Sequence, residues 1–208
     1  ENLKNISGSK VKKPTAEMLE LPEKVIQFGT GVLLRGLPDY FIDQANHQGI
    51  FNGRIVVVKT TSKAGADDFA NQDNLYTLCV KGIENGAEVE ENIINGAISR
   101  VLSATSEWAE ILKTAHQPEM RVVISNTTEV GIVKSEDKIT DTPPQSFPGK
   151  LLAFLHERYK AFNGSAESGM VIVPTELISD NADKLKEILL DLAIQNKLGW
   201  DFENWLKT

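Results

Sequence analysis

The 208-residue sequence is poor in cysteine, in basic charge and in long apolar runs. The single cysteine, Cys79, leaves no internal disulfide and no zinc site of several cysteines to consider. No apolar run reaches the roughly twenty residues that cross a bilayer, and the first residues show no signal-peptide pattern. Lysine and arginine total 22 against 29 aspartates and glutamates, a net charge of -7, which argues against nucleic-acid binding. We therefore expect a soluble, cytoplasmic protein with no nucleic-acid and no membrane partner.

Strand and helix patterns alternate along the chain, which is 41% hydrophobic and so has enough apolar residues for a sizeable core. Short apolar runs at 25–28, 54–60, 121–127 and 169–177 predict buried strands, with helix patterns between them. This order predicts an α/β fold with a Rossmann-like, mostly parallel, doubly wound sheet. Residues 75–82 and 87–96 predict an inserted β-hairpin, because Asn85-Gly86 between them is a strong signal for a tight turn.

Several local details are predicted from single residues. Pro38 is tolerated only in a first turn, so the helix around it should not begin much before Arg35. Cys79 is expected to be buried in its strand, and Gly199 is expected to end the helix over 181–197. The last residues, 200–208, predict a short helix with an exposed apolar patch, formed by Trp200, Phe202, Trp205 and Leu206.

A glycine-containing turn follows the first strand, in the stretch VIQFGTGVLLRGLPDYF over residues 25–41. At the carboxyl edge of a parallel sheet, Gly29 would permit a tight turn and Gly31 would let the backbone approach a dinucleotide pyrophosphate. The usual G-x-G-x-x-G spacing would place a third glycine where this chain has Leu34. The spacing alone is therefore compatible with a purely structural turn as well. Arg35 would either add a contact to the phosphates or pair with a carboxylate and point away.

Polar residues follow two other strands at the same predicted edge. The second strand ends in Lys59-Thr60-Thr61-Ser62-Lys63, where hydroxyls could bind a ribose, lysines would tolerate a 2′-phosphate, or the loop is merely solvated. At the end of the strand at 121–127, the side chains of Asn126, Thr127 and Thr128 would bind a nicotinamide ribose or carboxamide, or cap the next element. Glu129 would face either the substrate or solvent.

Several of these stretches together resemble the mannitol dehydrogenase family, the long-chain polyol dehydrogenases. FGTGVLLRG (28–36) is similar to the family fingerprint G-x-G-x-F-x-R-G, with Leu33 in place of phenylalanine, and QDNLYTL (72–78) and SNTTEVG (125–131) are similar to two further family segments. The resemblance runs from about Pro22 to the end and implies hydride transfer between NAD and a sugar acid in uronate catabolism. It implies that Thr60 lies near the adenosine ribose and that the cofactor is lined by Ile26, Gln27, Phe28, Gly29, Thr30, Gly31, Val32, Leu33, Leu34, Arg35, Gly36 and Leu37.

The chain also departs from the family pattern. Leu177 stands where polyol-oxidising members carry an asparagine near the reacting oxygen. The family also has a C-terminal helical domain that supplies a catalytic lysine, and this chain stops before it should begin. The resemblance thus implies a lead-in (1–22), an NAD-binding Rossmann domain (23–199) and the start of a connection (200–208) to a helical domain as partner. The fragment alone is expected to be inactive, and no catalytic residue is assigned within it.

Other interpretations stay open at this point. One is a non-catalytic module that binds or senses a dinucleotide, and another is a family member with mannitol or fructuronate as its substrate. A metal site is not expected, because His47, His116 and His156 are far apart in the sequence and no cluster has ligand spacing.

Overall fold

The computed structural model describes residues 3, 6, 11–60, 68–127 and 130–207. Its main sheet has five parallel strands in the order β6-β3-β2-β7-β8. These strands are β2 (Glu23–Phe28), β3 (Arg54–Lys59), β6 (Ile98–Ser103), β7 (Val122–Ser125) and β8 (Val171–Pro174). The order reverses between β2 and β7, which confirms the predicted doubly wound parallel sheet.

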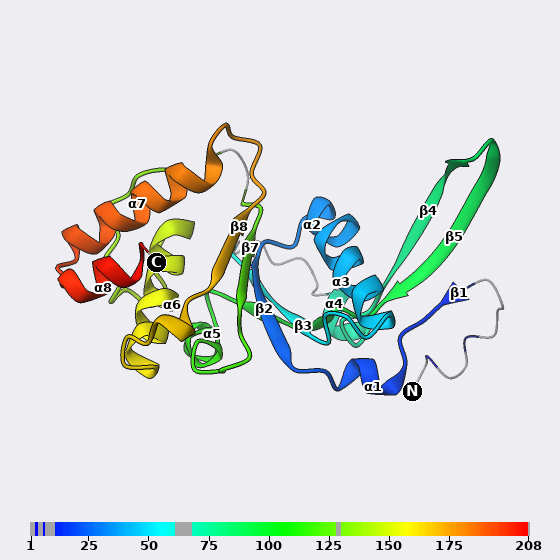
Figure 1. Cartoon of the computed structure of the whole chain (residues 1–208), viewed down its shortest axis with the longest axis horizontal. Coiled ribbons are helices and arrows are strands. Elements are labelled where there is room, and N and C mark those ends of the chain that lie inside the picture. The colour runs from blue at the N-terminus through cyan, green and yellow to red at the C-terminus, as the bar shows by residue number, and fades with distance from the viewer. Residues whose placement is uncertain (1–2, 4–5, 7–10, 61–67, 128–129, 208) are drawn as a thin grey trace.

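Helices cover both faces of this sheet (Figure 1). One face carries α2 (Val32–Gly36), α3 (Pro38–His47) and α4 (Asp68–Asn71), and the other carries α5 (Trp108–Thr114), α6 (Phe147–Ala161) and α7 (Asn181–Gln195). The remaining short elements are β1 (Val11–Lys12), α1 (Ala16–Leu19), the 3₁₀-helix η2 (Ala166–Ser168) and α8 (Trp200–Trp205). None of the helices in the described part of the chain is both long enough and apolar enough to span a bilayer.

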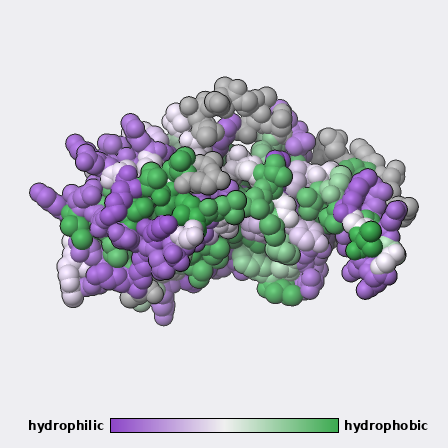
Figure 2. Space-filling model, turned by 90° about the horizontal axis from the view of Figure 1, so that it is seen from above, coloured by the Kyte–Doolittle hydropathy of each residue, from purple (hydrophilic) through white to green (hydrophobic). Residues whose placement is uncertain are grey.

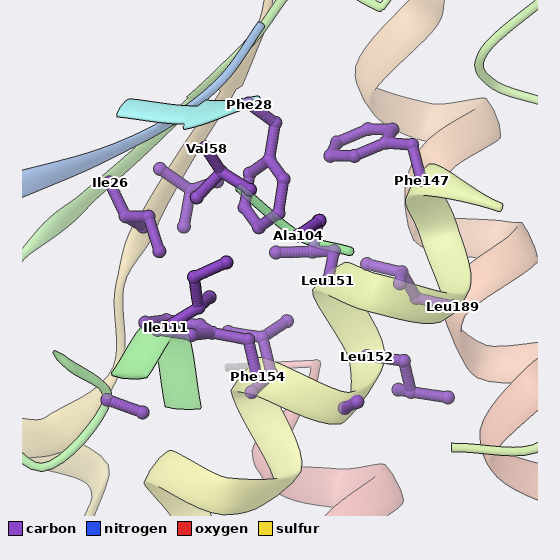
Figure 3. Packing of buried hydrophobic residues seen from close by; sticks show 14 of the residues in the cluster. Ile26, Phe28, Val58, Ala104, Ile111, Phe147, Leu151, Leu152, Phe154 and Leu189 are labelled. Carbon is purple, nitrogen blue, oxygen red and sulfur yellow. The ribbon is translucent and has the colours of Figure 1, made fainter. Parts of the chain in front are cut away.

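Successive residues of each strand point to opposite faces and fill two separate cores. Ile26, Phe28 and Val58 join the larger core with α5, α6 and α7, where the rings of Phe28 and Phe147 lie 5.2 Å apart (Figure 3). Val25 and Val57 join the smaller core under α2 and α3. Because both faces are covered, the strands read as unbroken apolar runs in the sequence.

The predicted hairpin is confirmed as β4 (Tyr76–Glu84) and β5 (Ala87–Asn95), paired antiparallel. Asn85 and Gly86 both have positive φ angles, 51° and 82°, as the expected tight turn requires. The hairpin projects from the body, with β1 beside β5 (Figure 1). The prediction that Cys79 is buried is wrong, because the hairpin carries it out to an exposed position.

One of the two predicted helix boundaries is confirmed and the other is wrong. The helix that contains Pro38 does not begin before Arg35, because the chain forms two helices that meet at Leu37, whose φ and ψ of -121° and -85° interrupt the turn. Pro38 then lies in the first turn of α3, where it is tolerated. At the end of α7, Lys197 and not Gly199 takes the left-handed conformation, with a φ of 55°. Gly199 instead precedes α8.

The predicted exposed patch on the last helix is largely wrong. Phe202 is 1% exposed and contacts the rings of Tyr159 and His156 edge-on. Trp205 packs on the same core, and its indole N–H donates to the carbonyl of Ser165 at 3.0 Å. Trp200 alone of the three aromatic residues is strongly exposed, at 73%. Most of the aromatic tail is therefore used within this domain.

A buried arginine ties α6 to the segments around it. The Arg158 side chain is 1% exposed, and its guanidinium donates to the carbonyls of Ala115, Gln117, Met120 and Ser168. Burial lowers the pKa of Arg158 to about 10, with the charge of Arg121 acting in the same direction. The four carbonyls satisfy the charged group, and the guanidinium in turn satisfies four backbone acceptors.

Replacing Arg158 by methionine should therefore destabilise the fold strongly. The variant leaves four buried carbonyls without their donor, and we expect the free energy of unfolding to fall by about 3 kcal/mol or more. Lys113→Met is the matched control, because it breaks only an exposed pair with Glu110 and should cost at most about 1 kcal/mol. Urea unfolding followed by circular dichroism measures both, and equal losses would contradict the role assigned to Arg158.

Candidate functional site

The candidate site lies where the strand order reverses, at the carboxyl ends of β2 and β7. β2 leads into α2 on one face of the sheet, and the chain after β7 leads to α6 on the other (Figure 1). Two backbone hydrogen bonds hold the strand ends together. The N–H of Gly29 donates to the carbonyl of Val58 at 3.0 Å, and the N–H of Asn126 donates to the carbonyl of Phe28 at 3.1 Å. In open α/β sheets this crevice is the usual position of a ligand.

The two glycines of the turn have different physical roles. Gly29 has a φ of +121°, and a Cβ atom at this position would lie 2.7 Å from the backbone oxygen of Asn126. The fold itself therefore requires glycine there. Gly31 has a φ of -65°, which any residue adopts; it is exposed, and a Cβ atom on it would have no neighbouring atom within 4 Å. Nothing within the described chain requires glycine at position 31, and the space beside its backbone is open.

The start of α2 leaves backbone donors available at this open space. Gly31 caps the helix without a side chain, and the first hydrogen bond runs from the N–H of Arg35 to the carbonyl of Gly31 at 3.3 Å. The preceding N–H groups, from Val32 to Leu34, consequently have no acceptor within the helix. Thr30 is half-buried in the turn itself. Unsatisfied N–H groups beside a position without a side chain fit a compact anionic group such as a diphosphate.

Several residues predicted to line the cofactor lie beneath the turn. Ile26, Gln27, Phe28 and Leu34 are all 0% exposed, so their side chains shape the turn from below. Val32, Leu33 and Leu37 instead point outward, with exposures of 75%, 41% and 46%. Gly36 ends α2 with open space around it.

The Arg35 side chain points into the protein. Its guanidinium lies 5.7 Å from the ring centre of Phe69 and 5.9 Å from that of Tyr76. The hydroxyl of Tyr76 donates to the backbone carbonyl of Arg35 at 2.8 Å. The sequence left two orientations open for Arg35, and the structure shows the one directed away from the open space at Gly31.

A buried carboxyl group lies next to this arginine. Asp39 is 0% exposed, and neither of its carboxylate oxygens has a hydrogen-bond partner among the described residues. The same holds for Oε1 of Gln27 and for Nε of Arg35. Burial raises the pKa of Asp39 to about 7, because the opposing influences of the Gln27 amide and the Arg35 charge are weaker. A protonated Asp39 could donate to the Gln27 oxygen and so satisfy both groups.

The base of the hairpin completes this polar cluster. The Asn95 side chain donates to the backbone carbonyl of Asp39 at 3.0 Å, and the N–H of Gly96 donates to the carboxylate of Asp43 at 2.9 Å. Asp43 also lies 3.6 Å from the His47 ring on the same helix. Five elements, β2, α2, α3, β4 and β5, thus meet beneath the glycine turn through polar contacts.

The polar residues after β7 are already engaged within the protein. The side-chain amide of Asn126 donates to the carbonyl of Thr175 at 2.8 Å. The N–H and hydroxyl of Thr127 both donate to Oε1 of Glu176 at 3.0 Å, and the Ser125 hydroxyl donates to the other oxygen of Glu176. Asn126 and Thr127 do lie at the same edge of the sheet as Gly29, as predicted, and the backbone oxygen of Asn126 lies beside Gly29, but these hydrogen bonds tie the end of β7 to that of β8. Thr128 and Glu129 lie outside the described residues.

The end of β3 lies at the same edge of the sheet. Thr60 is half-buried and directly follows β3, whose residue Val58 pairs with Phe28 before the glycine turn. The parallel register therefore brings Thr60 to the edge that carries Gly31, as predicted. Residues 61–67, including Thr61, Ser62 and Lys63, lie outside the described chain.

Sequence reasoning missed the residues that organise the site from inside. Glu176 is 3% exposed and accepts three hydrogen bonds from the end of β7 and the residues after it. A charged residue inside the predicted strand 169–177 was a usable signal, whereas nothing local marked Asp39 as buried. Leu177, the residue that departs from the family pattern, is 83% exposed. Within the described residues, no group of three or more His, Cys, Asp or Glu could hold a metal ion.

The strand order, together with a glycine turn at its switch point, defines this chain as a Rossmann domain. Residues 23–208 match the family model described as the mannitol dehydrogenase Rossmann domain. The chain therefore belongs to the mannitol dehydrogenase family, as its motifs indicated.

Individual relatives agree with this membership. The altronate oxidoreductase of Bacillus subtilis (strain 168) is 42% identical over 188 residues, which are 90% of this chain and 39% of that protein. The altronate oxidoreductase of Bacteroides thetaiotaomicron is 40% identical over 196 residues, which are 94% of this chain and 41% of that protein. The chain thus spans about two fifths of the length of these relatives.

Solved structures share the fold. The mannitol 2-dehydrogenase of Pseudomonas fluorescens, in a ternary complex with NAD and D-mannitol, aligns with a TM-score of 0.82 at 22% identity, over 99% of this chain and 43% of that one. A substrate-free D-sorbitol dehydrogenase aligns with a TM-score of 0.77 at 20% identity, over 100% of this chain and 44% of that one.

Asp39→Asn should change how the stability depends on pH. An aspartate with a pKa near 7 when folded and about 3.9 when unfolded stabilises the fold most below pH 4, and this contribution is lost as the pH rises from there through about 7. Asparagine cannot ionise, so we expect the variant to be more stable than the parent at pH 8 by roughly 2 to 4 kcal/mol, and similar at pH 4. Thermal and urea unfolding at several pH values measure this difference. Asp201→Asn, at an exposed position of α8, is the control, and an unchanged pH profile for Asp39→Asn would show that Asp39 is not held neutral.

Proposed function

We propose that this chain is the cofactor-binding domain of an NAD-dependent oxidoreductase that acts on a sugar acid. The observation that carries the proposal is the contrast between the two glycines. The fold requires Gly29, whereas Gly31 has open space beside it and is followed by N–H groups that have no acceptor within the helix. A structural turn accounts for the first glycine only, and a bound diphosphate accounts for the second.

The chain's own residues would bind and orient the dinucleotide. The backbone from Gly29 to Leu34 would hold the diphosphate, with Ile26, Phe28 and Leu34 fixing the turn from the core. The hydroxyl of Thr60 would bind the adenosine ribose at the end of β3. Gly36 and Leu37 would line the same loop, and Arg35 would position it through its contacts with the rings of Phe69 and Tyr76.

The other half of the cofactor would lie over the ends of β7 and β8. Asn126 and Thr127 would support this half through their backbone, because their side chains bind Thr175 and Glu176. Thr128 would contact the nicotinamide half and Glu129 would face the substrate. When bound, NAD accepts the hydride from the carbon that bears the alcohol, while the protein orients the reacting groups and excludes water.

We propose D-altronate and D-tagaturonate as the substrate pair, in uronate catabolism in the cytoplasm. Support comes from the altronate oxidoreductases at 40–42% identity and from Leu177, which stands in place of an amide side chain. Oxidation removes a hydride from the alcohol carbon and a proton from its hydroxyl, and a general base must accept that proton. We assign this base to a C-terminal helical domain that follows the Rossmann domain (23–199) and its connection (200–208), so that this chain alone binds NAD without turnover.

Gly31→Val should weaken dinucleotide binding without weakening the fold. The φ of -65° and the empty surroundings accept a side chain, but valine would occupy the space proposed for the diphosphate. We expect the Kd for NAD and for ADP-ribose to rise at least tenfold, about 1.4 kcal/mol, with the ligand-free Tm changed by less than about 2 °C. Thermal-shift and calorimetric titrations measure both quantities.

The control is Gly82→Val on the hairpin, where a side chain also meets open space. It should leave the affinity for NAD unchanged. A parallel titration with NADP tests the proposed site for the adenosine ribose. We expect NAD to bind more tightly than NADP. Equal affinity of the parent and Gly31→Val for ADP-ribose would contradict the proposed position of the diphosphate.

A further inference from the structure

A buried amide connects the inside of the domain to the glycine turn. Gln27 lies on β2 and is 0% exposed, and it points to the face covered by α2 and α3, as Val25 does. Its Nε2 donates to the carbonyl of Gly29 at 3.4 Å, so this carbonyl is directed into the protein. The C=O and N–H groups of a trans peptide point in opposite directions. The N–H of Thr30 is therefore directed toward the open side of the turn.

The orientation of this peptide decides which of its groups would face a ligand. Among the described residues, no acceptor binds the N–H of Thr30. The N–H groups from Val32 to Leu34 also have no acceptor within the helix. A diphosphate accepts hydrogen bonds from such N–H groups and is repelled by carbonyl oxygens. The hydrogen bond from Gln27 thus keeps the oxygen of Gly29 away from the space proposed for the diphosphate.

The other end of the Gln27 amide has no donor to bind. Its Oε1 and both carboxylate oxygens of Asp39 are buried without a hydrogen-bond partner among the described residues. Burial raises the pKa of Asp39, and the Gln27 amide opposes this shift, so the two groups are neighbours. Three buried acceptors without a donor are unfavourable in a protein interior. A single proton on Asp39 supplies the missing donor.

The surface above these groups is apolar. Figure 2 shows hydrophobic surface across the middle of the molecule, in the region where β8 and α2 lie in Figure 1. Val32 and Leu33 of α2 are 75% and 41% exposed there, and Leu34 beneath them is 0% exposed. A charge on Asp39 is consequently poorly solvated. Its nearest polar neighbours, rather than water, then determine whether the carboxyl group carries a proton.

We propose that Asp39 and Gln27 are positioning residues for the glycine turn, and we call Asp39, Gln27 and Gly29 the turn relay. Protonated Asp39 donates to Oε1 of Gln27 and thereby directs Nε2 to the carbonyl of Gly29. Ionised Asp39 repels Oε1 and attracts the N–H side of the amide, so it draws Nε2 away from Gly29. The turn is therefore ordered for a diphosphate when Asp39 is neutral.

The described elements packed against Asp39 contribute few charges. Arg35 of α2 lies beside it and favours the ionised carboxylate, an influence that is weaker than burial. Tyr76 of β4 also faces it, with a hydroxyl whose pKa is raised by burial and by the charge of Asp39. The neighbours from β2 and β5 are the neutral amides of Gln27 and Asn95, and Asn95 donates to the backbone carbonyl of Asp39 at 3.0 Å.

The next carboxyl group on α3 has different surroundings. Asp43 is 0% exposed, and burial raises its pKa as well. Its carboxylate, however, accepts from the N–H of Gly96 at 2.9 Å and lies 3.6 Å from the ring of His47. These contacts lead to the base of the hairpin and along α3, and not to the turn. Asp43 is therefore an internal comparison for Asp39.

This inference rests on the proposed diphosphate site, so its first test contains no nucleotide. In the ligand-free chain, we expect the Asp39 carboxyl carbon to titrate in NMR spectra with a pKa of about 7. The amide resonance of Thr30 should follow the same curve, and in Asp39→Asn it should stay constant between about pH 6 and about pH 8.5.

Gln27→Met separates the turn relay from a through-space effect of the charge. Methionine has a similar length but lacks both ends of the amide, so Asp39 should still titrate while the Thr30 resonance no longer follows it. A Thr30 resonance that ignores the titration of Asp39 in the parent, or follows it equally in Gln27→Met, would overturn the proposal. The comparison of the parent with Asp39→Asn decides the question if Gln27→Met does not fold.

The affinity for ADP-ribose tests the consequence for binding. A ligand that favours neutral Asp39 takes up a proton when it binds, so we expect the Kd of the parent to rise at least about fivefold from about pH 6 to about pH 8.5. ADP-ribose has no group of its own that titrates in this range. Asp39→Asn should keep the low-pH affinity of the parent throughout, because the amide that it introduces can donate to Gln27 at every pH. Asp43→Asn is the control and should retain the pH dependence.

The outcomes distinguish the turn relay from the proposed function. If the Kd of the parent is independent of pH while Gly31→Val still raises it, the relay is wrong and the diphosphate site stands. If Thr30 follows Asp39 but neither ADP-ribose nor NAD binds, the proposed function is wrong and the relay stands. A pH dependence that Asp43→Asn removes and Asp39→Asn preserves would also contradict the role assigned to Asp39.

Discussion

The close approach of two backbone segments at the switch point is the constraint on which the site depends. Gly29 lies so near the carbonyl of Asn126 that no side chain fits between them. This contact lets the first strand turn sharply into α2 and places Gly31 at the open edge of the sheet. On the other side of the crevice, Glu176 binds the residues after β7 and so fixes the ends of β7 and β8. The turn is thus shaped by the protein alone, and a ligand would meet a preformed surface.

A second layer of polar residues supports the turn from below. Arg35 lies near two aromatic rings, and Asp39 lies buried beside Gln27 with unsatisfied oxygens. Such a group destabilises the fold in its charged form, yet it occurs directly under the segment that would carry the cofactor. Buried, incompletely paired polar groups are typical of functional sites, where stability is sacrificed for a particular arrangement. The position of Asp39 therefore agrees with a role for this region beyond packing.

The sequence predicted the sheet, the hairpin and the meeting of the strand ends, because each depends on a short local pattern. Unbroken apolar runs indicated strands covered on both faces, and Asn85-Gly86 indicated the turn. Burial was harder to predict, since it depends on partners distant in the chain. Cys79 reads as a core residue but lies on a projecting hairpin, and Trp205 reads as an exposed residue but packs on α6. The same limit hid Asp39, whose surroundings come from β2, α2 and β5, and Glu176, whose partners lie about fifty residues earlier at the end of β7.

The hairpin β4–β5 gives the domain a mechanical connection between its periphery and its centre. The two strands are paired along their whole length, from Tyr76 opposite Asn95 to Glu84 opposite Ala87, so they form a stiff arm. The root of the arm is the same pair, Tyr76 and Asn95, that bonds the backbone of Arg35 and Asp39. A force applied at the tip would accordingly reach the end of α2 and the first turn of α3 through two hydrogen bonds, with the arm acting as a lever.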